Sequence, residues 1–257
     1  MSALEPLLRR DRWLVIGALA VVFSMAWIYM LTGAGMDMGT GVVGAMSMPM
    51  VWSPGYAVLV FLMWWIMMLA MMLPSASPAV LLFAKVSHSQ KASGRPFVPA
   101  GFFLAGYLMV WGLFSLIATG AQWGLEASGV LSMMTGSRNL ALSAAILIAA
   151  GLWQFTPLKQ ACLRHCRGPL HFLMQGFRPG VRGALWMGAE HGLFCLGCCW
   201  FLMGLLFYGG VMNVYWIAGI AVYVLLEKVT PVGHWLSYVT GLVLVGSGGS
   251  LLLTKSL

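Results

Sequence analysis

Charged residues are scarce in this sequence. Only 8% of the 257 residues are Asp, Glu, Lys or Arg, and only six of them are acidic. Soluble domains carry about 25% charged residues, so too few are present here to build an ordinary water-facing surface. Apolar residues make up 61% of the chain instead, and the mean hydropathy is +0.90. The composition therefore excludes a soluble domain and indicates an integral membrane protein.

Cysteine is scarce as well, and nucleotide motifs are missing. The five cysteines lie in apolar sequence and are too few for a secreted disulfide scaffold. A net charge of +8 would suggest nucleic acid as the partner of a soluble protein. In a membrane protein the basic residues first report orientation. We therefore expect a lipid bilayer, and no nucleic acid, as the partner of this chain.

Seven stretches are long enough to cross a bilayer, because a helix needs about 20 apolar residues to span about 30 Å of hydrocarbon. They are residues 13–31, 56–73, 97–119, 139–156, 183–207, 213–229 and 235–253. We predict an all-α fold, a polytopic transmembrane helix bundle of about seven spans that forms one domain over residues 1–257. The first stretch resembles the start of a signal peptide, but its long apolar run without a cleavage site favours a retained helix.

Two features modify this picture of the spans. The second span is expected to break at Pro74 and to continue as a short extension, with Ser75 and Ser77 lining a small polar cavity. Small residues in the third and seventh spans predict close helix packing. These residues are Gly101, Ala105, Gly112, Gly241, Gly246, Gly248 and Gly249.

The basic residues indicate the orientation. Twelve of the 14 Lys and Arg fall on one side of the predicted spans, which leaves only Arg138 and Lys255 opposite. The positive-inside rule then predicts a cytoplasmic N-terminus and an outward C-terminus.

Few ionisable residues lie deep in the predicted spans, where such groups are costly and usually functional. Glu190 and His191 lie in the fifth span, and Glu227 and Lys228 end the sixth. One explanation is a structural ion pair, formed by Glu190 or Glu227 with Lys228 or a nearby arginine.

The fifth span also carries a row of soft metal ligands. His191, Cys195, Cys199 and Met203 follow one i, i+4 ridge, and Cys198 lies beside it. Thiolate, thioether and imidazole favour Cu(I), and thiolate and imidazole also suit Zn(II). The alternative is that these residues only fill a buried helix, as Cys and Met often do.

A second cysteine pair lies between the fourth and fifth spans, in a predicted cytoplasmic loop. Cys162 and Cys166 could hold one metal ion if this segment is helical, and the neighbouring Arg164 and Arg167 favour thiolate. The spacing is not that of a zinc finger. The alternative is a pair of reduced cytosolic thiols.

Methionine is the third candidate ligand, with 20 residues in the chain. Five lie in the predicted outward loop after the first span, where core packing does not explain them: Met36, Met38, Met46, Met48 and Met50. They resemble the Met-rich loops of extracytoplasmic copper proteins, although a loop in the membrane interface is an alternative. Met63, Met67 and Met71 continue inward as an i, i+4 row in the second span, flanked by Met68 and Met72.

Three segments together resemble a bacterial family of predicted metal-binding integral membrane proteins. They run from Trp64 to Pro78, with Met67-Met68 and Met71-Met72; from Trp153 to Pro169, with Cys162 and Cys166; and from Gly192 to Met203, with Cys195, Cys198 and Cys199. The resemblance implies a multi-pass protein of the bacterial inner membrane that binds metal at these positions. It does not specify copper.

The first functional hypothesis is a copper-handling membrane protein, a carrier, store or metal-insertion factor for Cu(I), with zinc as the less favoured metal. No energy-coupling motif indicates a pump, and an enzyme is not the favoured class. A membrane complex or a copper enzyme would be its protein partner. The alternatives are a thiol-disulfide oxidoreductase built on Cys195 and Cys198, and an accessory subunit of a larger membrane complex.

Overall fold

The computed structural model of the protein describes residues 4–32, 52–92, 98–132, 136–137, 139–168, 170, 173 and 177–256. The helices are α1 (Leu4–Leu31), α2 (Pro54–Ala92), α3 (Ala100–Ala127), α4 (Leu140–Gln154), α5 (Pro157–Arg167), α7 (Gly180–Gly204), α8 (Leu206–Gly209), α9 (Val214–Val229) and α10 (Gly233–Ser256). Two strands of two residues each, β1 (Leu131–Ser132) and β2 (Gly136–Ser137), pair antiparallel. The all-α helix bundle is confirmed.

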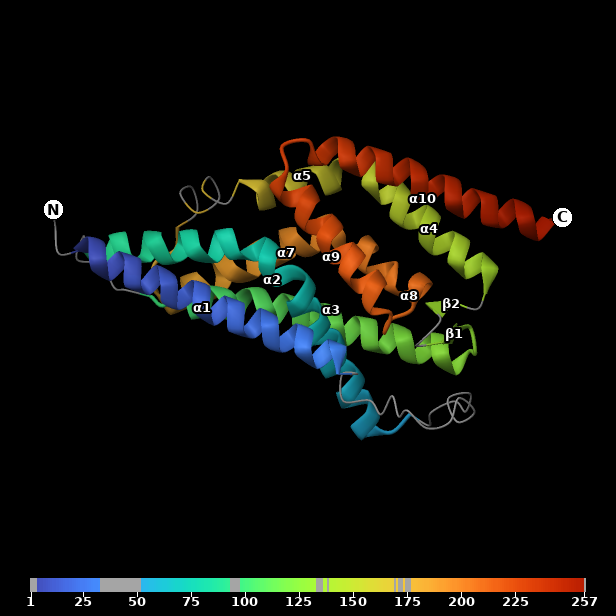
Figure 1. The fold of residues 1–257 in the computed structure, drawn as a ribbon, viewed down its shortest axis with the longest axis horizontal. Helices are drawn as coiled ribbons and strands as arrows, with labels where there is room; N and C mark the ends of the chain where they lie inside the picture. The colour runs from blue at the N-terminus through green and yellow to red at the C-terminus, as the bar shows by residue number, and fades with distance from the viewer. Residues whose placement is uncertain are drawn as a thin grey trace.

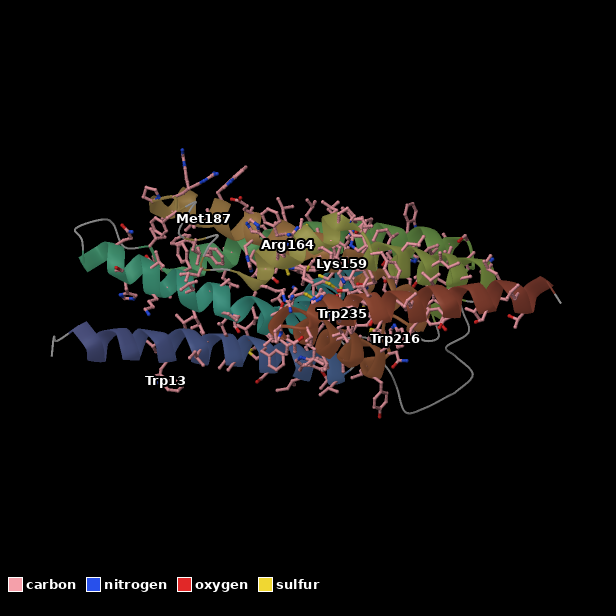
Figure 2. All side chains as sticks on the ribbon, turned by 90° about the horizontal axis from the view of Figure 1, so that it is seen from above. Trp13, Lys159, Arg164, Met187, Trp216 and Trp235 are labelled. Carbon is pink, nitrogen blue, oxygen red and sulfur yellow. The ribbon has the colours of Figure 1, made fainter. Side chains whose placement is uncertain are left out.

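The helices form an elongated bundle, in which α1 begins at one end and α10 finishes at the other (Figure 1). Many side chains that face outward are large and apolar, as in Trp13 of α1, which is 68% exposed and points away from the bundle (Figure 2). An apolar exterior of this kind is compatible with a membrane protein.

The described residues contain five helices that are long and apolar enough to cross a membrane, or six when the bent pair α4 and α5 counts as one span. The sixth of the seven expected stretches, residues 213–229, corresponds to α9. This helix has only 16 residues, about 24 Å at 1.5 Å per residue, which is shorter than the hydrocarbon layer. The number of spans and their orientation stay predictions.

Helix α2 does not break at Pro74, contrary to the sequence-based expectation. It continues through Pro74 and Pro78 to Ala92 and bends along its length (Figure 1). Pro78 has no N–H to give to the Pro74 carbonyl, and the Ser77 hydroxyl donates to that carbonyl instead, at 2.8 Å. Because a side chain replaces the missing donor, the helix bends here without ending.

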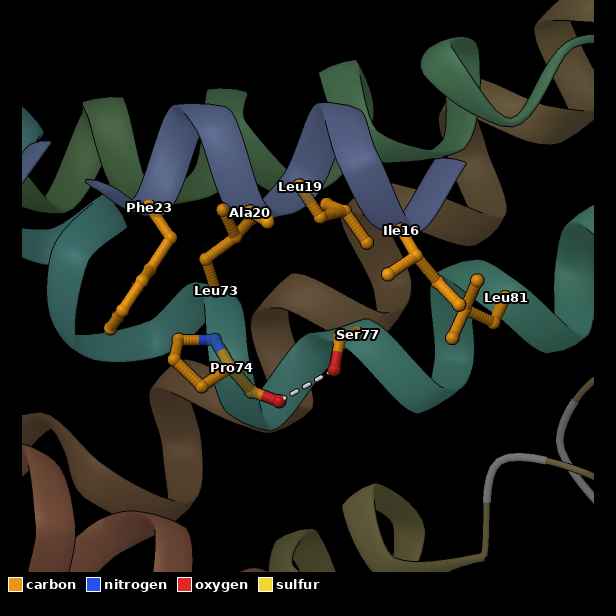
Figure 3. A pocket seen from close by; sticks show the side chains of 8 residues that line it. All are labelled: Ile16, Leu19, Ala20, Phe23, Leu73, Pro74, Ser77 and Leu81. Carbon is orange, nitrogen blue, oxygen red and sulfur yellow. Dashed lines mark hydrogen bonds between the residues drawn. The ribbon is translucent and has the colours of Figure 1, made fainter. Parts of the chain in front are cut away.

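The expected polar cavity at this bend is instead largely apolar. A cavity of about 420 Å³ lies between α1 and α2, where Ser77 is its only hydroxyl-bearing lining residue (Figure 3). The lining residues are Ile16, Leu19, Ala20, Phe23, Leu73, Pro74, Ser77 and Leu81. Ser75 faces elsewhere, toward Lys228 of α9.

Helices α4 and α5 meet at a bend of 64°. Thr156 precedes Pro157 and is therefore pushed out of the helical region, with φ −71° and ψ 139°. Its hydroxyl accepts a hydrogen bond from the Lys159 N–H and so caps α5. Residues 157–167, which were expected in a cytoplasmic loop, are thus a helix that packs against α7 and α9.

Helix α3 packs closely against α7 because glycines leave room for the backbones. A Cβ on Gly106 would lie 2.0 Å from the Leu185 carbonyl oxygen, and one on Gly188 would lie 1.9 Å from that of Phe103. Of the glycines expected to pack, Gly241 and Gly248 of α10 lie against Phe155 and Ile148, whereas Gly101, Gly246 and Gly249 meet open space. Close packing of the third span is confirmed. The glycine that allows it is Gly106, which was not among the expected residues, and the face of α3 that carries Gly106 therefore lies against α7.

Candidate functional site

Three cysteines of α7 form the centre of a buried sulfur cluster. Cys195, Cys198 and Cys199 are at most 1% exposed and lie in one core with Met67, Met71, Met72 and Met203. The thiols of Cys198 and Cys199 both donate to the Cys195 carbonyl, at 3.0 and 2.9 Å. These bonds turn both thiols back toward the Cys195 level of α7, so the three sulfurs gather within about one turn of the helix.

Helix α2 adds a thioether to this cluster. The Met72 sulfur lies 3.9 Å from the Cys199 sulfur. Metal–sulfur bonds of a d¹⁰ ion are about 2.3 Å, as for zinc, so one ion could contact both sulfurs at an S–metal–S angle of about 116°. Met67 and Met71, from the second-span row that the sequence indicated as candidate ligands, are buried in the same core. Met72, which flanks that row in the sequence, makes the contact with the cysteine thiol.

A lysine also faces the sulfur cluster. The Lys228 ammonium of α9 donates to the Cys195 sulfur at 2.9 Å and to the Ser75 hydroxyl at 3.2 Å. The Tyr107 hydroxyl of α3 lies 3.1 Å from the same sulfur and 3.5 Å from the Met72 carbonyl oxygen, and its single proton can be donated to either. Cys195 is therefore held by a cation and a hydroxyl, an environment that stabilises a thiolate.

Helix α5 contributes its two cysteines differently. Cys166 packs against the core that contains Cys195, Cys198 and Cys199. The Cys162 sulfur instead packs at Gly197, only 2.8 Å from where a Cβ would be. Cys166 is partly exposed, whereas Cys162 is buried. The structure thus places Cys166 beside the core of α7 cysteines. Cys162 instead packs against α7 at Gly197.

His191 and Met203 lie on either side of the α7 cysteines along the helix. His191 is buried, and its ring lies about 6 Å from those of Phe103 and Tyr107. Met203 is buried in the sulfur-rich core. The neighbouring His165 of α5 stacks on Phe194 at 3.8 Å between ring centroids, which fixes α5 against α7 beside the cluster.

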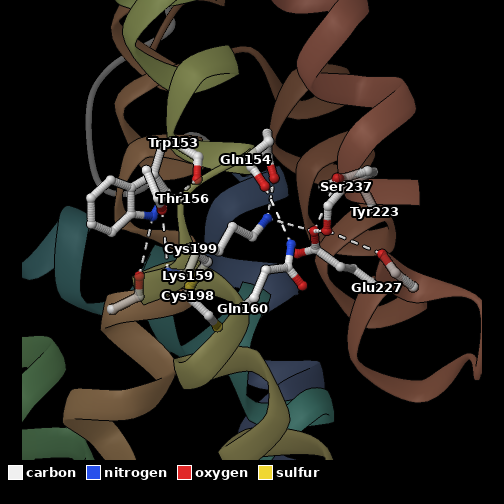
Figure 4. Close-up of polar contacts among 12 residues, drawn as sticks. Trp153, Gln154, Thr156, Lys159, Gln160, Cys198, Cys199, Tyr223, Glu227 and Ser237 are labelled. Atoms are coloured by element: carbon white, nitrogen blue, oxygen red, sulfur yellow. Dashed lines mark hydrogen bonds and ion pairs between the residues drawn. The ribbon is translucent and has the colours of Figure 1, made fainter. Parts of the chain in front are cut away.

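Glu227, next to Lys228, belongs to a different site. Its carboxylate forms an ion pair with Lys159 at 2.5 Å, and both side chains are 0% exposed. Ser237 and Tyr223 donate to the same carboxylate oxygen at 2.6 and 3.2 Å, and Lys159 also donates to the Gln154 amide oxygen (Figure 4). We call this group the Glu227 network.

The Glu227 network corrects two sequence-based expectations. The partner of Glu227 is Lys159, not Lys228 or an arginine. Lys159 and Lys228 were also counted among the cytoplasmic basic residues, yet both side chains are buried in the bundle, where Figure 2 shows Lys159. The orientation signal therefore depends on the other basic residues.

A chain of polar side chains near the C-terminal end of α3 was not predicted from the sequence. The indole N–H groups of Trp64 and Trp52 donate to Gln122 and Glu126, at 2.6 and 3.0 Å, and Gln122 donates to Glu126 at 2.8 Å. The helical spacing of Ser115, Thr119, Gln122 and Glu126 could have revealed this polar stripe. It ties the start of α2 to α3.

Two observations bear on which side chains of this chain could hold a metal ion. Within the described ranges, no three His, Cys, Asp or Glu side chains are arranged to hold one ion. The first-loop methionines, Met36, Met38, Met46, Met48 and Met50, lie outside the described residues. A metal at the sulfur cluster would therefore have few ligands, with the Met72 thioether among them.

A protein-family model matches residues 61–251 and is described as PpoB2, a copper chaperone. The chain belongs to the PpoB2 copper chaperone family. The matched residues run from α2 into α10, so they include all five cysteines, Met72, Tyr107 and Lys228. No curated protein and no solved structure matches the chain.

Membership of the PpoB2 family agrees with the expected handling of copper. It also agrees with the metal-related family that the three sequence segments resemble, all of which lie within residues 61–251. Residues 33–51, which hold the first-loop methionines, precede the matched part.

Proposed function

We propose that the protein is a membrane-embedded chaperone that binds Cu(I) at the sulfur cluster and passes it to a copper enzyme or membrane-complex partner. The observation that carries the proposal is the meeting of the Met72 and Cys199 sulfurs, 3.9 Å apart, beside Cys195. Thiolate and thioether are soft ligands that favour Cu(I), and the thioether distinguishes this set from the thiolate and imidazole ligands that also suit zinc. The bound ion would be cargo, held by the Cys195 and Cys199 thiolates and the Met72 thioether.

A low ligand number suits a chaperone. Zinc in structural sites takes four tetrahedral ligands, whereas a site of two thiolates and one thioether leaves the ion open to attack by another sulfur. Cys198 lies beside Cys195 on α7, and Cys166, which is partly exposed, packs against the same core. Transfer would therefore run by ligand exchange from the buried cluster through Cys166 on α5.

The Met-rich first loop completes the proposal on the outer side of the bacterial inner membrane, where the predicted orientation puts it. Thioethers resist the oxidation that removes thiols as ligands in such surroundings. Met36, Met38, Met46, Met48 and Met50 would collect Cu(I) there before it enters the bundle. His191 and Met203 would extend the set of soft ligands along α7.

Metal loading of the purified protein tests this proposal. The full chain, purified anaerobically in detergent, is expected to bind Cu(I) in a fixed ratio measured by mass spectrometry, with sulfur ligands seen by X-ray absorption. Met72→Leu is expected to weaken Cu(I) about tenfold in competition with bicinchoninate, equivalent to about 1.4 kcal/mol. Met109→Leu on the exposed face of α3 is the matched control.

Two further variants separate binding from transfer. Cys195→Ser with Cys199→Ser is expected to abolish stoichiometric copper, whereas Cys166→Ser is expected to keep the bound copper and slow its release to the chelator. Unchanged copper in the double variant would overturn the proposal. Metal-free protein with a disulfide among Cys166, Cys195 and Cys198 would favour the thiol-disulfide oxidoreductase instead.

A further inference from the structure

Lys228 is a buried cation whose hydrogen bonds go to a serine hydroxyl and a cysteine sulfur, not to a carboxylate. It is 7% exposed, and its two hydrogen bonds go to Ser75 and Cys195. The adjacent Glu227 pairs with Lys159. In the part of the chain that the structure describes, no carboxylate lies within ion-pair distance of Lys228. A buried ion without a countercharge costs several kcal/mol, and a Cys195 thiolate, 2.9 Å away, is the countercharge that the contacts of Lys228 offer.

The net charge of the sulfur cluster, counted together with Lys228, then depends on whether the bound metal ion is monovalent or divalent. Cu(I) with two thiolates leaves one negative charge in excess, which the Lys228 ammonium cancels. A divalent ion with the same two thiolates is already neutral, so Lys228 would leave one positive charge uncompensated in a low-dielectric interior. A third thiolate would restore balance for the divalent ion. The described residues, however, provide no three Cys, His, Asp or Glu side chains arranged around one point.

Building on the proposed Cu(I) site, we infer that Lys228 is the specificity-determining residue that makes the sulfur cluster selective for a monovalent soft cation over a divalent one. It acts as a fixed countercharge 2.9 Å from Cys195 and does not itself bind the metal. Tyr107 contacts the same sulfur, at 3.1 Å, without adding charge. Selectivity against zinc thus comes from charge balance in addition to ligand softness.

Paired metal affinities test this inference. Cu(I) and Zn(II) affinities are measured by anaerobic competition with bicinchoninate and with a zinc-chelating dye, for the wild type and for Lys228→Met and Lys228→Arg. Lys228→Met is expected to lower the Cu(I)/Zn(II) affinity ratio about tenfold or more, and Lys228→Arg is expected to keep it because the charge remains. Tyr107→Phe serves as the matched neutral change on the same sulfur.

The outcomes distinguish this inference from the proposed function. No Cu(I) bound to the wild type would overturn both. Cu(I) bound to the wild type with an unchanged ratio in Lys228→Met would overturn the role of Lys228 alone. If Lys228→Met does not fold, the wild type is titrated with Ag(I) and Cd(II), two soft ions that differ in charge. Tighter binding of Ag(I) supports the countercharge, and equal or tighter binding of Cd(II) contradicts it.

Discussion

Glu227 and Lys228 are neighbours on α9, yet they serve two buried regions of different chemistry. Glu227 is enclosed in a network of oxygen and nitrogen groups from α4, α5 and α10, where its partner Lys159 satisfies its charge. Lys228 faces thiols from α7 and a serine of α2. Adjacent residues point about 100° apart on a helix, so one short helix supplies both regions.

The two regions differ in how the chain balances a buried charge. In the Glu227 network each ion has the other as its partner, and hydrogen bonds from Ser237 and Tyr223 stabilise the carboxylate. At the sulfur cluster the negative charge is conditional, because a thiol ionises readily only when a cation or a metal stabilises its thiolate. The first region suits a structural role, and the second suits reversible binding of a cation.

Glu227→Gln is expected to give the largest effect on stability. The change leaves the Lys159 ammonium buried without its partner, which costs about 3–5 kcal/mol. Lys228→Met should cost less, because Cys195 can then keep its proton. The midpoint of thermal unfolding in detergent measures both. A larger loss for Lys228→Met than for Glu227→Gln would contradict the contrast between the two regions, and the pair Lys159→Met with Glu227→Leu should recover part of the loss.

Gly106→Val is expected to have the next largest effect, because it pushes α3 away from α7. The added side chain meets the Leu185 carbonyl, and overpacking of this kind costs about 1–3 kcal/mol. Tyr107 follows in sequence, so its contact with Cys195 would be displaced and Cu(I) affinity should fall as well. Gly101→Val on the same helix is the control, since nothing lies within 4 Å of its Cβ position. Equal effects of the two changes would contradict the packing role of Gly106.

Local sequence patterns predicted the helices and the shared position of the cysteines on α7; that these residues bind metal stays a prediction. Apolar length identified the long helices, and the i, i+4 spacing from His191 to Met203 put the α7 cysteines on one ridge, as they lie in the bundle core. Thr156-Pro157 also carried a helix-start signal that would have placed Cys162 and Cys166 on a helix. These features depend on residues close together in the chain.

Contacts between helices were not predictable in the same way. Lys228 meets Cys195 across 33 positions and Lys159 meets Glu227 across 68, and no local periodicity encodes either pair. The choice of Met72 over Met71 as the neighbour of Cys199 depends on how α2 is rotated against α7. That rotation is set by side-chain packing along the whole interface, so a single sequence leaves it open.

Tyr107→Phe is expected to give the smallest effect on Cu(I) binding, and it separates hydrogen bonding to Cys195 from the charge of Lys228. It removes one hydroxyl from the Cys195 sulfur, at 3.1 Å, and leaves Lys228 and the aromatic packing in place. A hydrogen bond contributes about 0.5–1.5 kcal/mol, so Cu(I) affinity should fall about two- to tenfold while the Cu(I)/Zn(II) ratio stays constant. Tyr215→Phe, on the exposed surface, is the matched control. A change in the ratio as large as that of Lys228→Met would mean that hydrogen bonding to Cys195, rather than the charge beside it, sets which ion the cluster accepts.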